Sequence, residues 1–113
     1  MEPTLRTVGT VHVIAVKGRM TLGSKETEAI GAAIRDMLHA GKRHILVDLR
    51  KVDYVDSASV GVLVAHLKLT SEKGGALKLF GANERVQAMF ATTKLDLVFE
   101  IFRDEAEAVA SFG

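Results

Sequence analysis

The sequence predicts a single α/β domain, because strand-like and helix-like segments alternate along all of its 113 residues. Residues 45–49 are apolar apart from Asp48, which is typical of a central strand covered on both faces. Apolar residues also recur at the spacing of one helix face, at Ile30, Ala33, Ile34, Met37 and Leu38. We therefore expect a mixed sheet of four to five strands with about four helices, formed by residues 1–113 as one domain.

The first twenty residues predict two strands that turn at Gly9 and Thr10 and pair as a hairpin. Residues 18–24 are expected to form a loop before the first helix. Ser24 is suited to cap the start of that helix, since its hydroxyl can accept from an unpaired backbone N–H. Gly41 is suited to end the same helix in a left-handed conformation.

The second half of the chain continues the alternation. A second helix is predicted over residues 57–73, and a strand over 77–80. Asn83 can cap a third helix, and residues 98–102 predict a final strand. Asp104 with Glu107 approximates a capping box for a short last helix.

Composition excludes several classes of function. The net charge of +1 indicates neither a nucleic-acid nor a membrane surface, and the absence of cysteine excludes thiolate catalysis and disulfides. No apolar run is long enough to span a bilayer, and residues 1–4 do not resemble a secretory signal, so we expect a cytoplasmic protein. The following basic residues are dispersed and are expected to be solvated charge: Arg35, Lys42, Arg43, Arg50 and Lys51.

The second predicted helix carries two apolar stripes. One stripe should pack on the sheet and consists of Val60, Leu63, Val64 and Leu67. The other lies on the far side and consists of Ala58, Val62, Ala65 and Leu69. Either a neighbouring helix covers this second stripe, or it is a surface that binds a partner.

The start of this helix carries hydroxyl groups beside a carboxylate, in Asp56, Ser57 and Ser59. Backbone N–H groups at a helix N-terminus are unpaired and the helix dipole favours negative charge there, so a phosphoryl group could be received or bound. The alternative is plain helix capping, because Asp and Ser are preferred helix starts.

This stretch resembles the signature of the STAS family (sulfate transporter and anti-sigma factor antagonist). In that family a hydrophobic strand runs into Asp-Ser-Ser-Gly-Leu-Gly at the start of a helix. The aligned residues here are Asp56, Ser57, Ala58, Ser59, Val60 and Gly61. The resemblance extends over about 100 residues, in the order and spacing of its turns and acidic positions.

The resemblance implies a regulatory binding protein, similar to an anti-sigma factor antagonist, and no enzyme. In that class the unmodified domain binds a kinase-like anti-sigma factor and frees a sigma factor, and phosphorylation of a serine switches binding off. The usual acceptor position is Ala58 here, which has no hydroxyl. Ser57 or Ser59 could replace it, or the chain could lack the switch. The resemblance places partner binding at Asp56, Ser57, Ala58 and Ser59 and near the loop of residues 18–23. The second apolar stripe adds Val62 and Leu69 to the expected contact surface.

Two other functions stay open. The Ser57-Ala58 pair also resembles the STAS accessory subunit of a lipid-transport ABC ATPase complex, whose partner would be the transporter ATPase. A small enzyme or nucleotide binder could instead use the carboxylates of Asp48, Asp53 and Asp56. We expect no cofactor and no metal, since the four histidines lack ligand spacing. The sequence leaves the partner, the pathway and the oligomeric state undetermined.

Overall fold

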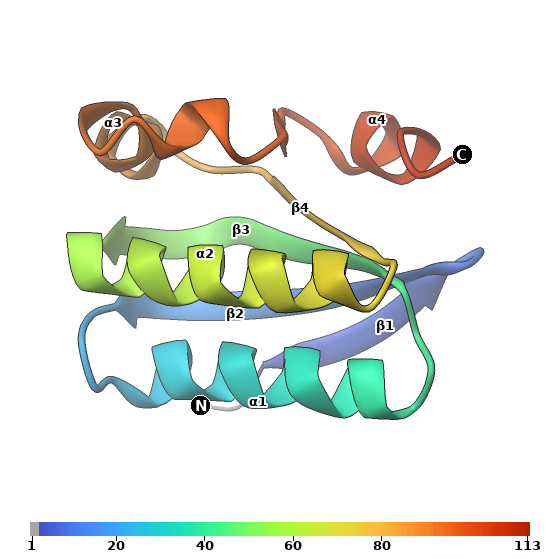
Figure 1. Cartoon of the computed structure of the whole chain (residues 1–113). Helices are drawn as coiled ribbons and strands as arrows, with labels where there is room; N and C mark the ends of the chain where they lie inside the picture. The colour runs from blue at the N-terminus through green and yellow to red at the C-terminus, as the bar shows by residue number, and fades with distance from the viewer. Residues whose placement is uncertain (1–2) are drawn as a thin grey trace.

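A computed structural model describes residues 3–113 as one five-stranded mixed sheet with helices on both faces (Figure 1). The strands lie in the order in which they occur in the chain: β1 (Thr4–Val8), β2 (Val11–Met20), β3 (His44–Val55), β4 (Ala76–Phe80) and β5 (Ile101–Phe102). β1 pairs antiparallel with β2, and the remaining neighbours pair parallel. The helices are α1 (Lys25–His39), α2 (Ser57–Glu72), α3 (Glu84–Thr92), the 3₁₀ turn η1 (Leu95–Leu97) and α4 (Glu105–Ala110). The predicted α/β fold is confirmed.

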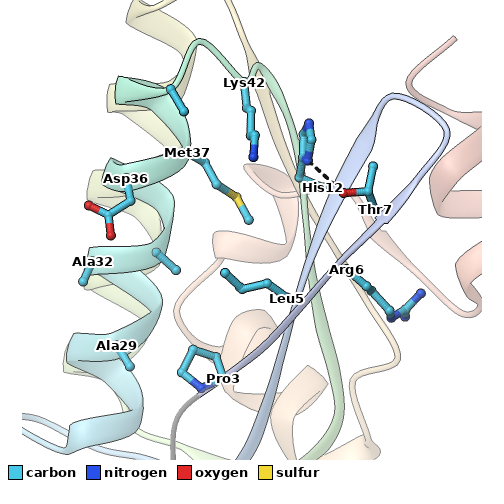
Figure 2. A pocket seen from close by; sticks show the side chains of 12 residues that line it. Pro3, Leu5, Arg6, Thr7, His12, Ala29, Ala32, Asp36, Met37 and Lys42 are labelled. Atoms are coloured by element: carbon cyan, nitrogen blue, oxygen red, sulfur yellow. Dashed lines mark hydrogen bonds between the residues drawn. The ribbon is translucent and has the colours of Figure 1, made fainter.

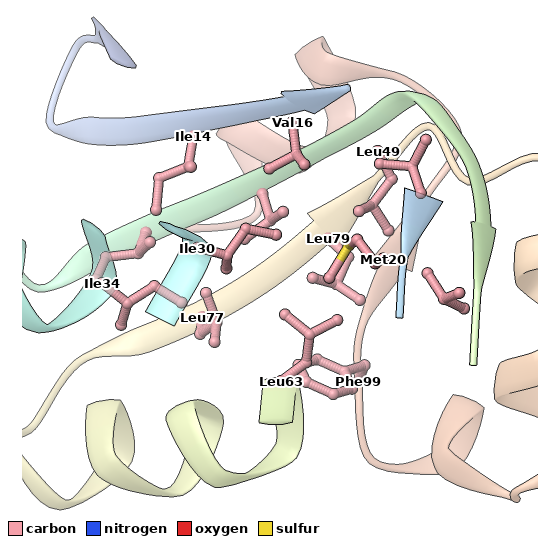
Figure 3. Packing of buried hydrophobic residues seen from close by; sticks show 14 of the residues in the cluster. Ile14, Val16, Met20, Ile30, Ile34, Leu49, Leu63, Leu77, Leu79 and Phe99 are labelled. Atoms are coloured by element: carbon pink, nitrogen blue, oxygen red, sulfur yellow. The ribbon is translucent and has the colours of Figure 1, made fainter. Parts of the chain in front are cut away.

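The two sheet faces form separate cores because strand side chains alternate between them. Ile14 of β2 and Val47 of β3 belong to the larger cluster, which α1, α2 and α3 cover (Figure 3). Their neighbours Val13 and Leu46 belong to a smaller cluster on the other face, closed by α4 through Ala108. The central strands are therefore apolar on both faces, as the run 45–49 predicted.

Helix boundaries follow the predicted caps. The side chains of Ser24, Asp56, Asn83 and Asp104 each accept a hydrogen bond from the backbone N–H three residues later. Gly41 takes a φ of +84° after α1, where a residue with a Cβ would be strained. These local signals stop and start the helices where the sequence indicates.

Two strands are longer than predicted. β2 includes residues 18–20, which we expected to be loop, and β3 continues beyond the predicted residues 45–49 to Val55 and so contains Asp53. The pairing of β2 with β3 shifts register twice, between Ala15 and Lys17 and between Gly18 and Arg19. β3 takes one extra residue at each shift, and such bulges hide the alternation by which a strand is recognised.

The last strand is shorter than predicted. β5 contains only Ile101 and Phe102, whereas residues 98–100 follow η1 as turn and coil. The buried Phe99 packs edge-on against Phe90 of α3, with ring centroids 5.7 Å apart. A loop segment that buries an apolar side chain in the core has the same composition as a strand, because burial requires the same side chains in both cases. The sequence therefore predicted a strand here.

Candidate functional site

The candidate site is the end of the molecule where β3 passes into α2. Both α1 and α2 begin at this end, on the left in Figure 1. The Asp56 carboxylate accepts from the backbone N–H of Ser59 at 2.8 Å and from that of Leu22 at 2.9 Å. Asp56 thus caps α2 and also fixes the loop that leads into α1.

The hydrogen bond from the Ser59 N–H is the main reason why the pKa of Asp56 lies below its ordinary value, with the Leu22 N–H adding to it. The carboxylate therefore remains charged at neutral pH. Its negative charge sits at the positive end of the helix dipole, which is the favourable arrangement.

The two candidate acceptor serines lie in different environments. Ser57 is exposed at the first position of α2, whereas Ser59 has 0% of its surface exposed. Ala58 between them is half-buried. The predicted acceptors are therefore distinguished by access: in the folded chain only the Ser57 hydroxyl faces solvent.

Ser59 belongs to a network of hydroxyl groups that joins α2 to the start of α1. Its Oγ lies 3.1 Å from Oγ1 of Thr27. Thr27 donates its own hydroxyl hydrogen to the Thr21 carbonyl, so Ser59 is the donor to Thr27. Every buried polar side-chain atom among residues 3–113 has a partner. Ser59 and Thr27 hold the two helix starts together.

A groove of about 610 Å³ runs between α1 and α2 from this end. Leu22 stands at it with 76% of its surface exposed, and Val62 of α2 also lines it, half-exposed. Exposed apolar side chains of this size beside a groove are typical of a surface that binds another protein. We refer to Leu22, Ser57, Ala58, Gly61 and Val62 as the α2-end surface.

His66 and Arg35 bridge the two helices further along the groove. The Arg35 guanidinium can only donate, so Nε2 of His66 accepts from it at 2.9 Å. Nδ1 of His66 consequently carries the hydrogen and donates to the Val62 carbonyl at 2.7 Å. Gly31 makes room for the ring, since a Cβ there would lie 3.0 Å from its atoms.

Leu69 does not lie with the other predicted contact residues. It is twelve residues along α2 from Ser57, about 18 Å at the usual helical rise. It is half-buried, packs against the larger core and lines a separate cavity with Leu38 and Arg43. The second stripe of α2 is thus split: Leu69 packs against the larger core, while Val62, which is equally half-exposed, lines the groove at the α2-end surface.

The three carboxylates considered for an enzyme are not brought together. Asp48 faces the opposite side of the sheet, where it pairs with Arg50 and Arg6. Asp53 is exposed, and Asp56 is the helix cap. Within residues 3–113 no group of three or more acidic or histidine side chains is arranged to hold a metal ion.

Another cavity, of about 530 Å³, lies between the edge strand β1 and α1 (Figure 2). Leu5 and Met37 point into it from opposite sides, and His12 stands at its rim, bonded to Thr7 at 3.3 Å. Its lining contains no serine and lies away from Ser57. Nothing in it adds to the chemistry of the α2-end surface.

Asp56→Ala should lower the free energy of unfolding by about 1 kcal/mol, because it removes the cap of α2. Asp56→Asn should cost less, since one oxygen can still accept from Ser59 but none remains for Leu22. Because the pKa of Asp56 is lowered in the folded protein, the wild type exceeds Asp56→Asn in free energy of unfolding by the full amount at neutral pH. This difference is lost as the pH falls below the ordinary value of 3.8. Chemical denaturation of the three proteins at several pH values checks this, and an equal gap at all pH values would contradict it.

The sequence placed the loop of residues 18–23 near the expected contact surface, but nothing in it indicates that Leu22 is the exposed apolar side chain there. Thr27 carries no signal of its role in the sequence. The burial of Ser59 depends on the approach of α1, which local patterns do not report. One local signal is available, since Ser59 lies four residues before the core residue Leu63 and therefore on the same side of α2.

Comparison with known proteins places this geometry in a family. The family model described as "STAS domain" matches residues 2–108. A relative from Thermotoga neapolitana, named for the anti-sigma factor antagonists, is 38% identical over 74 residues. That match spans 66% of this chain and 66% of the relative, slightly under two thirds of its length. Among residues 3–113 no helix has the length and apolarity needed to cross a membrane.

Solved structures agree with the fold. A crystal structure of a Thermotoga maritima protein described as an anti-sigma factor antagonist superposes with a TM-score of 0.87 at 26% identity. It covers 97% of this chain and 93% of that one. The phosphorylated form of the Bacillus protein SpoIIAA superposes with a TM-score of 0.72 over 96% of this chain and 97% of its own. At 20% identity this second likeness shows the fold alone.

Proposed function

The chain belongs to the STAS domain family, and we propose that it is a cytoplasmic anti-sigma factor antagonist that regulates transcription by protein binding. Its unmodified form binds a kinase-like anti-sigma factor across the α2-end surface and so frees a sigma factor. The relatives named for this role support the proposal. The chain acts as a binding partner and, at most, as the kinase's substrate.

The observation that carries the proposal is the position of Ser57. Its exposed hydroxyl stands at the start of α2 and follows Asp56, whose carboxylate accepts from the Leu22 N–H. Leu22 and Val62 both line the groove between α1 and α2. Apolar contact area and a modifiable hydroxyl are therefore combined in one small surface. A partner that covers this surface would hold Ser57 within reach of its own active site.

Phosphorylation of Ser57 would act on binding and not on folding. A phosphoryl group adds about −1.5 to −2 charge at neutral pH. The helix N-terminus tolerates that charge, but Asp56 repels it, and a partner that packs on Leu22 and Val62 would have to bury it. Ser59 is unsuited as the acceptor because its hydroxyl is buried and donated to Thr27.

Affinity capture from the native lysate tests the proposal, with the wild type, Val62→Glu and Ser71→Glu as baits and mass spectrometry as the readout. Ser71 is exposed near the other end of α2, so its variant adds the same charge away from the surface. We expect a kinase-fold anti-sigma factor with the wild type and Ser71→Glu, and its loss with Val62→Glu. A transporter ATPase in its place would favour the lipid-transport branch and overturn the proposal.

Gly61→Ala should separate stability from binding. A Cβ at Gly61 would meet no atom within 4 Å, and the residue is exposed inside α2. Alanine should therefore raise the free energy of unfolding by about 1 kcal/mol. Because the added methyl group projects into the α2-end surface, the captured amount of partner should fall. Thermal unfolding and quantitative capture measure the two effects, and unchanged capture would place Gly61 outside the contact.

A further inference from the structure

The sheet face opposite α1 and α2 is only partly covered. α4 closes the end that holds Val11 and Leu46, whereas Lys17, Arg50 and Lys51 are exposed on the remainder of the face. A cavity of about 350 Å³ lies on this remaining part. It is lined by Thr4, Arg6, Ala15, Val16, Lys17, Asp48, Arg50 and Lys51. Four of these eight residues are cationic, and one is anionic.

A bulge in β3 gathers the positive charge. Leu49 and Val52 are both buried in the larger core, although strict alternation would place residues three apart on opposite faces. The explanation is a bulge: Asp48 pairs with Ala15 and Lys51 with Lys17, so β3 has one more residue than β2 between these two pairs. The bulge leaves Arg50 and Lys51 together on the face that holds the cavity, since a bulge opposes two residues to one. The sequence alone indicated dispersed charge here.

Asp48 orders the guanidinium groups around the cavity. Its carboxylate accepts from Nε of Arg50 at 3.0 Å and from Nη2 at 2.8 Å, and Nη2 of Arg6 lies 3.6 Å away. Burial alone would raise the pKa of Asp48, but the Arg50 hydrogen bonds and the charges of both arginines outweigh it and keep the pKa below its ordinary value. Asp48 therefore stays ionised. Glu105 of α4 binds Arg6 from the rim.

The Arg50 side chain also packs on Phe80 and Gly81. Its guanidinium carbon lies 5.1 Å from the centroid of the Phe80 ring. Gly81 gives the side chain its path, because a Cβ there would lie 2.3 Å from the Arg50 Cγ. A guanidinium fixed before a ligand arrives loses little conformational freedom on binding. Nη1 of Arg50 makes no hydrogen bond within residues 3–113 and remains free to donate to a ligand.

We propose that this cavity, which we call the basic pocket, binds a small doubly charged oxyanion such as the phosphate group of a phosphate monoester. Lys17 and Lys51 are neighbours in the β2–β3 register and form no ion pair within the part of the chain that the structure describes. Together with Glu105, the six charged side chains sum to +2, which a dianion balances. Arginine and lysine are the side chains that bind phosphate oxygens.

NMR titration of ¹⁵N-labelled protein tests the proposal, with sodium phosphate and glycerol phosphate as separate probes and chloride at equal ionic strength as the reference. We expect saturable shifts at Thr4, Lys17 and Lys51. Lys17→Ala/Lys51→Ala should weaken binding at least tenfold, and Lys17→Gln/Lys51→Gln should do the same. The matched variant Lys68→Ala/Lys73→Ala removes two exposed charges from the α2 region and should bind as the wild type does.

The outcomes separate the sources of the anion. Tighter binding of glycerol phosphate would identify an organic phosphate as the ligand, and equal binding would identify the free anion; both support the basic pocket. If the Lys17/Lys51 variants gave the same shifts as the wild type, the proposed phosphate site would be wrong. It would also be wrong if an oligonucleotide or anionic vesicles bound to the protein while phosphate and glycerol phosphate did not. The basic pocket faces away from the α2-end surface, so this result is independent of the proposed function.

Discussion

Ser57→Asp should weaken binding of the anti-sigma factor by about a hundredfold, which corresponds to about 3 kcal/mol. The added carboxylate would stand at the exposed start of α2, next to Asp56 and beside the apolar side chains that the partner must cover. Burying an unpaired charge in an interface, or placing it against a like charge, costs several kcal/mol. Titration calorimetry with the captured partner measures the effect.

The fold of Ser57→Asp should be unaffected, because the side chain is solvated and acidic groups are favourable in the first turn of a helix. Ser57→Asn is the matched control, since it has a similar shape and no charge, and it should bind within a few fold of the wild type. If Ser57→Asp bound as tightly as Ser57→Asn, charge at this position would not control docking, and the proposed switch would be wrong.

Ser59→Asp should destabilise the whole domain by about 3 kcal/mol, although it is the same substitution two residues further along α2. Ser59 is fully buried and its hydroxyl meets Thr27, whose own hydrogen is given to the Thr21 carbonyl. A carboxylate there would be taken out of water without a cation to pair with. It would also lie close to the charge of Asp56.

Denaturant unfolding measures this second effect, with Ser59→Ala as the control. Alanine removes one hydrogen bond and should cost only about 1 kcal/mol. A stable Ser59→Asp would show that this site opens readily, and Ser59 would then be available to a kinase. The pair of Asp variants therefore distinguishes the exposed acceptor from the buried one by two different readouts, binding for Ser57 and stability for Ser59.

The fold could be predicted because its signals are local. The caps at Ser24, Asp56 and Asn83 and the turn at Gly41 each depend on a few neighbouring residues. The bulges of β3 could not, because an extra residue breaks the alternation and makes the end of a strand look like a loop. The segment around Phe99 gave the opposite error. It was predicted as a strand because a loop segment that buries an apolar side chain has the composition of a strand.

The resemblance predicts a candidate site at the start of α2. It could not predict that Ser57 is exposed and Ser59 buried, because their accessibility depends on how α1 packs there. Leu69 fits the helical stripe as well as Val62 does, and only the tertiary structure separates them. The basic pocket was missed because Arg6, Lys17 and Arg50 lie far apart in the chain and meet through strand pairing.

Docking of an anti-sigma factor across the α2-end surface can be mapped by NMR of the labelled protein in complex with the purified anti-sigma factor, because every backbone amide reports its own surroundings. We expect the largest shifts at Leu22, Ser57 and Val62, with little change at Lys17 and Lys51 on the opposite face. Shifts concentrated on that opposite face, with Ser57 and Val62 unchanged, would contradict this docking site.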